Sequence, residues 1–117
     1  MDAGDNAELA EAIRALGVAF INRLPVTLAD IGQELSAIEH DPGDLKAWKT
    51  LHRHLHSIAG AAGTFGYVEL GDRARALEHR VNAMQKDGTT LVDAVRSAFL
   101  QDQTGFMEWV QSSCLPP

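Results

Sequence analysis

The apolar residues of this chain recur at intervals of three and four positions along almost its whole length, and no stretch alternates with a period of two for long. Intervals of three and four place side chains on one face of an α-helix, whereas a period of two would indicate a strand. The pattern therefore predicts an all-α chain. Five apolar stripes can be followed, over residues 9–20, 28–38, 45–65, 70–84 and 92–110.

Residues that favour turns or helix ends separate these stripes. Pro25 lies between the first two, and an internal proline removes a backbone hydrogen bond and clashes with the preceding turn, so we expect a helix to end there. Asp41 is expected to cap the third helix, with Pro42 in its first turn. The later boundaries are assigned to Gly66, to Asp87-Gly88 and to Thr90, the expected cap of the last helix.

The links between these helices are short, and short links make consecutive helices pack as antiparallel neighbours. The predicted fold is therefore an antiparallel up-and-down four-helix bundle with an additional N-terminal helix, which we expect to act as a lid. A chain of 117 residues is the size of one domain. We expect a single domain over residues 1–117, ordered over about 6–111 and flexible at both ends.

Composition narrows the range of partners. The 16 acidic residues exceed the 10 Lys and Arg, giving a net charge of −6, which opposes binding to nucleic acid or to an anionic membrane surface. The longest stretch without Asp, Glu, Lys or Arg, residues 54–68, is shorter than the ~20 residues of a membrane span. With an acidic N-terminal segment in place of an export signal, we expect a cytoplasmic protein. The lone Cys114 can form no internal disulfide.

The segment 51–66 departs from ordinary helix composition. Gly60 and Gly63 interrupt it, although a glycine inside a helix costs about 1 kcal/mol relative to alanine. His56 lies one turn before Gly60 on an outward-facing stripe, and Ala59 also follows it without bulk. A protruding imidazole beside nearly bare backbone would let another protein approach closely, so Ala59, Gly60 and Gly63 are predicted to provide clearance for docking.

The run from His56 to Gly66, with Leu77-Glu78 following, resembles the signature of histidine-containing phosphotransfer (HPt) domains of bacterial phosphorelays. The matching features are an apolar residue, glycine, two small residues, an apolar residue and glycine at fixed offsets from the histidine: Ile58, Gly60, Ala61, Ala62, Phe65 and Gly66. The resemblance implies a four-helix bundle in which His56 accepts the phosphoryl group and Gly60 clears space for the partner.

One position departs from that family pattern. Family members commonly have a lysine three positions after the histidine, near the phosphoryl oxygens, where this chain has Ala59. Another cation could take its place, and Arg53, one turn before His56, is the candidate nearest in sequence. Arg75 and Arg80 on the next helix remain alternatives, as does a solvated surface arginine with no role.

The register of a helical hairpin gives a separate prediction about Glu78. If the third and fourth helices reverse near Gly66, residues facing each other have numbers that sum to about 134, which puts Glu78 opposite His56. A carboxylate there could hold one imidazole nitrogen and leave the other nucleophilic. A solvated surface glutamate is the alternative.

The other histidines suggest a metal site only weakly. His52 and His56 are four residues apart on one helical face and could chelate a metal, whereas His54 points elsewhere. The chain has no Cys-x-x-Cys or His-Glu-x-x-His pattern and no cofactor-binding motif. We therefore expect no resident metal or cofactor. The resemblance implies that magnesium is held by the partner receiver domain.

These observations predict a monomeric phosphorelay intermediate without kinase activity of its own. The resemblance implies that His56 relays a phosphoryl group between aspartates of response-regulator receiver domains, with a hybrid histidine kinase as another partner. Two alternatives remain. A noncatalytic adaptor would bind receivers without transfer, in keeping with Ala59, and a metal-binding bundle would use His52 and His56.

Overall fold

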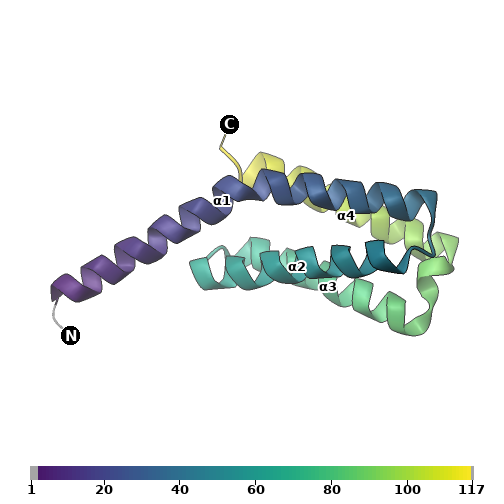
Figure 1. Cartoon of the computed structure of the whole chain (residues 1–117), viewed down its shortest axis with the longest axis horizontal. Coiled ribbons are helices and arrows are strands. Elements are labelled where there is room, and N and C mark those ends of the chain that lie inside the picture. The colour runs from purple at the N-terminus through teal and green to yellow at the C-terminus, as the bar shows by residue number, and fades with distance from the viewer. Residues whose placement is uncertain (1–2, 117) are drawn as a thin grey trace.

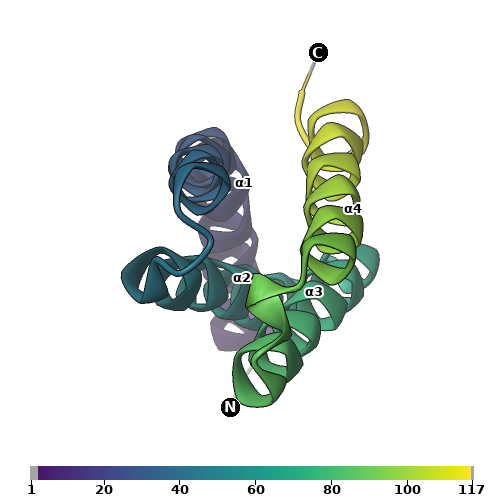
Figure 2. The ribbon, with the colours of Figure 1, turned by 90° about the vertical axis from the view of Figure 1, so that its right-hand side faces the viewer.

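A computed structural model describes residues 3–116, which form four α-helices and one short 3-10 helix. The helices are α1 (Ala3–His40), α2 (Leu45–Phe65), α3 (Val68–Asp87) and α4 (Asp93–Ser113), with η1 (Thr89–Leu91) before α4. Consecutive helices run antiparallel (Figure 1), and the end-on view shows them arranged in the order α1, α2, α3, α4 around a common centre (Figure 2). The predicted all-α, antiparallel four-helix architecture is present.

The core consists of one apolar face from each helix. The most extensive packing joins α2 to α3, and α1 covers the other side of α2, while α4 packs on α3 and α1. Trp48 of α2 lies against Phe99 of α4 across the bundle, with ring centroids 5.8 Å apart. The buried residues follow the predicted stripes and include Leu28, Ile31, Ile38, Leu51, Leu55, Leu70, Val81, Phe99 and Val110.

The break expected at Pro25 is wrong. The expected N-terminal helix and the first bundle helix are one helix of 38 residues with Pro25 inside it. An internal proline costs on the order of 3 kcal/mol, but Leu24 and Leu28 on either side are buried, and their burial offsets a cost of that size.

Nor does the first helix form a lid. At about 1.5 Å per residue, α1 is far longer than its neighbours. Its N-terminal part projects beyond the bundle rather than covering it (Figure 1). All residues from 4 to 16 are exposed, and we refer to this segment as the arm.

The helix ends agree with the sequence at two positions and differ at two. Gly66 and Gly88 end α2 and α3 with φ of 83° and 73°, in the left-handed region that favours glycine. The predicted cap Asp41 instead accepts a hydrogen bond from Gly43 N, and Asp44 caps α2 by accepting one from Ala47 N at 3.0 Å. The cap predicted at Thr90 is also wrong, because Thr90 lies in η1 and α4 starts after Val92.

One helix, Gly4–His40, is long and apolar enough to cross a membrane as judged by length and composition. Its most apolar window has a mean hydropathy of 1.3 and is 17% buried. Charge-free stretches do not reveal this helix in the sequence, because charged residues interrupt its apolar run. The helix continues into the bundle, where Leu24, Leu28 and Ile31 are buried, but most of its most apolar window is exposed.

Candidate functional site

The outer face of α2 presents His56 to solvent. Leu55 and Ile58 on the opposite face are buried in the core, which fixes the rotation of the helix and turns His56 outward. The imidazole side chain is 73% exposed. At Gly60 and Gly63, one and two turns further on, an added Cβ atom would meet nothing within 4 Å. The histidine therefore stands beside open space bordered by bare helix backbone.

Glu78 of α3 lies directly against this histidine. Its Oε2 atom is 2.6 Å from Nδ1 of His56, and its side chain is only 10% exposed. The antiparallel register predicted this juxtaposition, and the solvated surface glutamate is excluded by the burial. An ionised carboxylate only accepts hydrogen bonds, so Nδ1 donates and carries the proton. The lone pair of the neutral ring is then on Nε2, the nitrogen that does not contact Glu78.

Ala59 does not belong to the exposed stripe, and the prediction that it helps to form the docking surface is wrong. It is 2% exposed because it follows Leu55 by four residues and so lies on the side of α2 that packs on α3. The position where the family commonly has lysine is therefore inside the α2–α3 contact in this chain. The glycines at 60 and 63 are exposed as expected.

Gly71 of α3 lies where α3 packs against the backbone of α2. It is buried, and a Cβ atom there would lie 3.5 Å from the backbone oxygen of Ala59 and from the nitrogen of Gly63. These are ordinary van der Waals distances, so an alanine would also fit here. Gly71 is therefore a packing residue, two helical turns before Glu78, and not a further residue of the site.

The three arginines considered as substitutes for the family's lysine lie in different surroundings. Arg53 is exposed, but it borders a shallow hollow with Lys49 and Thr50, toward the N-terminal end of α2. Helical side chains lean toward the N-terminus, which explains this direction. Arg80 pairs with Asp102 and lies over the ring of Phe99 on the far side of α3. Arg75 is exposed one turn before Glu78.

The neighbouring histidines do not complete a metal site. His52 stacks on His56 with ring centroids 6.4 Å apart and planes 10° from parallel. His54 faces a groove between α1 and α2 instead. Within residues 3–116, no group of three or more His, Cys, Asp or Glu side chains is placed to hold a metal ion. The geometry thus offers a nucleophilic nitrogen, an orienting carboxylate and an open approach.

Comparison with known proteins agrees with this geometry. The family model of the Hpt domain matches residues 15–103. The chain is 27% identical over 89 residues to the chemotaxis protein CheA of Klebsiella aerogenes, an alignment that covers 76% of this chain but 14% of that protein. The chain thus spans about one seventh of that relative's length. No solved structure matches significantly. The chain therefore belongs to the Hpt domain family, which has a phosphotransfer role in two-component signalling together with kinases and response regulators.

Proposed function

We propose that His56 is the phospho-accepting residue and that the chain relays a phosphoryl group between receiver-domain aspartates. The observation that carries this proposal is the pair formed by exposed His56 and buried Glu78, with Nδ1 and Oε2 2.6 Å apart. Phosphoryl transfer depends mainly on positioning and on charge neutralisation, so a partner can supply what this small surface lacks.

The transfer step uses the Nε2 lone pair. Nε2 attacks the phosphorus atom of an aspartyl phosphate on a donor receiver, forming an N–P bond while the P–O bond breaks and the aspartate leaves as a carboxylate. The ring gains positive charge as this bond forms, and the Glu78 carboxylate at Nδ1 compensates for it. Attack by the aspartate of an acceptor receiver then reverses these changes. His56 is regenerated, and the chain acts as a carrier rather than as an enzyme working alone.

The surface around His56 suits a partner that brings its own metal ion. No three-ligand group exists among the described residues of this chain, and we propose that magnesium enters with the receiver. Gly60 and Gly63 leave space for the receiver's backbone to reach the imidazole. Arg53, although directed along α2, is within one helical turn and is our proposed cation of this chain near the phosphoryl group.

The test is phosphotransfer from a radiolabelled phosphorylated receiver to the purified chain. The wild type should acquire acid-labile, base-stable label, and His56→Gln should acquire none. His52→Gln is a matched control, because His52 stacks on His56 on the same helix and lacks the contact with Glu78, and this variant should still be labelled. Label that persists on His56→Gln would disprove the assignment. Receiver binding without any transfer to the wild type would instead establish an adaptor.

A further inference from the structure

The arm exposes an apolar stripe that has no partner within the bundle. Leu9, Ile13 and Leu16 follow one another at intervals of four and three residues, on the face of α1 that continues into Phe20. Leu9 is 53% exposed and Leu16 is 59% exposed. The arm mostly precedes the part of the chain that matches the Hpt family, which begins at residue 15. Its apolar stripe therefore requires an explanation of its own.

The exposed area of the whole chain agrees with an uncovered interface. A compact monomer of 12.7 kDa is expected to expose about 6,200 Å², whereas this chain exposes 7091 Å². The excess is close to the ~800 Å² that each partner buries in a protein–protein interface of ordinary size. An isolated helical segment as short as the arm is also marginally stable in water without packing.

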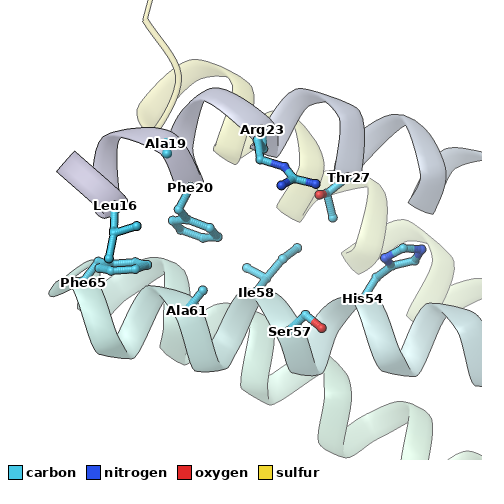
Figure 3. Close-up of a pocket in the computed structure, with 10 residues that line it drawn as sticks. All are labelled: Leu16, Ala19, Phe20, Arg23, Thr27, His54, Ser57, Ile58, Ala61 and Phe65. Carbon is cyan, nitrogen blue, oxygen red and sulfur yellow. The ribbon is translucent and has the colours of Figure 1, made fainter. Parts of the chain in front are cut away.

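A groove between α1 and α2 lies next to the arm, as Figure 3 shows. Its volume is about 390 Å³, and its walls are mainly apolar, with Leu16 and Phe20 of α1 facing Ala61 and Phe65 of α2. The rings of Phe20 and Phe65 are 6.0 Å apart. The stripe on the arm and the α1 wall of this groove form one continuous face.

We propose that the arm is a self-association element, through which two copies of the chain pack antiparallel along Leu9, Ile13 and Leu16. Alternating intervals of four and three residues are the pattern of a two-helix seam. With Ile13 of one copy opposite Leu16 of the other, Leu9 lies opposite Phe20, and the end of each arm enters the groove of the second copy. This dimer replaces the monomer expected from the sequence and does not depend on phosphotransfer.

Charge favours a second copy in this antiparallel orientation. Glu8 and Arg23 lie on the same side of the stripe, about 22 Å apart along one helix at 1.5 Å per residue. Neither forms an ion pair with another described residue of its own chain, and Arg23 borders the groove. Antiparallel pairing brings Glu8 of one copy next to Arg23 of the other, whereas parallel pairing would place the acidic ends together. The same acidic turns make an anionic membrane a poor occupant.

Sedimentation equilibrium or light scattering of the purified chain, from about 1 µM to about 1 mM, tests the proposal. The mass of the wild type should rise with concentration toward twice 12.7 kDa. Leu9→Glu and Leu16→Glu should each raise the dissociation constant by about 100-fold or more. Val18→Glu is the matched control, because Val18 is also exposed but lies on the opposite face of α1, and this variant should associate like the wild type.

A charge exchange tests the orientation. Glu8→Arg and Arg23→Glu should each weaken association by about threefold, and the double variant should recover it. Because the two residues are too far apart to interact within one chain, recovery requires two antiparallel copies. A wild type that stays monomeric up to the highest concentration would overturn the proposal. So would a Val18→Glu variant that dissociates like Leu16→Glu, or a monomer that instead co-sediments with vesicles of phosphatidylcholine and phosphatidylglycerol.

Discussion

Replacing Gly60 by alanine should make the protein more stable and less active at once. Gly60 lies inside α2 with no atom within 4 Å of the added Cβ position, so the methyl group enters without a clash. Alanine in a helix interior is favoured over glycine by about 1 kcal/mol. For a domain of this size that gain corresponds to a rise in melting temperature of about 4 °C.

The same methyl group should impede docking. It would project from the turn that follows His56, into the open space through which we propose that a receiver approaches Nε2. A displacement of about 1 Å between reacting groups can reduce a rate by as much as 100-fold, and we expect kcat/KM for phosphotransfer to fall by at least ~10-fold. The affinity of an unphosphorylated receiver should fall as well.

Gly105→Ala provides the matched control. Gly105 also lies inside a helix with no atom near its Cβ position, but it belongs to α4, and the hollows beside it are lined by residues of α1, α3 and α4 without His56 or Glu78. This variant should gain the same stability and keep full transfer activity. The measurements are the melting temperature and the kcat/KM for phosphotransfer of both variants and of the wild type. Transfer by Gly60→Ala at the wild-type rate would refute the docking role, and a lower melting temperature would refute the view that Gly60 is unstrained.

Four further predictions concern single side chains. Glu78→Ala should slow phosphorylation of His56 by about 10- to 100-fold, and Glu78→Gln, which can still accept from Nδ1, should lose less; equal rates for Glu78→Ala and wild type would contradict the orienting role. Gln103→Met should raise the free energy of unfolding by about 1–2 kcal/mol in urea titrations, because the buried Gln103 amide has no hydrogen-bond partner among the described residues; a loss of stability would contradict this. Arg53→Ala should shorten the half-life of the phosphohistidine by less than about threefold, as exposed charges interact weakly in water; a larger effect would mean that Arg53 binds the phosphoryl group directly. Burial, with Glu69 adding to it, raises the pKa of the Cys114 thiol, so less thiolate is present at about pH 8. Iodoacetamide should therefore react with Cys114 more slowly than with glutathione, and the rate for Cys114 should increase as the pH rises. A rate equal to that of glutathione would contradict the raised pKa.

Much of the fold follows from features that act locally. Helix ends at Gly66 and Gly88 could be predicted because the left-handed conformation strongly favours glycine. The contact between His56 and Glu78 could be predicted because two adjacent helices with a tight turn share a register. Both inferences depend on neighbouring residues only, and neither requires knowledge of the rest of the bundle.

The errors arose where tertiary packing decides between local alternatives. Pro25 usually ends a helix, but buried leucines on both sides hold α1 together. Asp41 and Asp44 are both residues that favour helix caps, and the structure uses Asp44. In this arrangement buried Trp48 donates from Nε1 to the Pro42 oxygen at 2.9 Å, a tertiary contact that the local sequence does not reveal. Ala59 was assigned to the outer face because it is small, although its rotation about the helix axis places it under α3.

The places where the chain departs from good local design are not scattered at random, and this supports the assignment of the site. Gly60 and Gly63 weaken a helix, and Glu78 buries a carboxylate. All three departures lie around His56, where Glu78 contacts Nδ1 and where we propose that a partner approaches. The exposed leucines of the arm are a departure of the same kind, but they are remote from His56 in sequence and precede the family match almost entirely. A role in phosphotransfer for the first group therefore cannot account for the second, which is why the arm requires a separate partner.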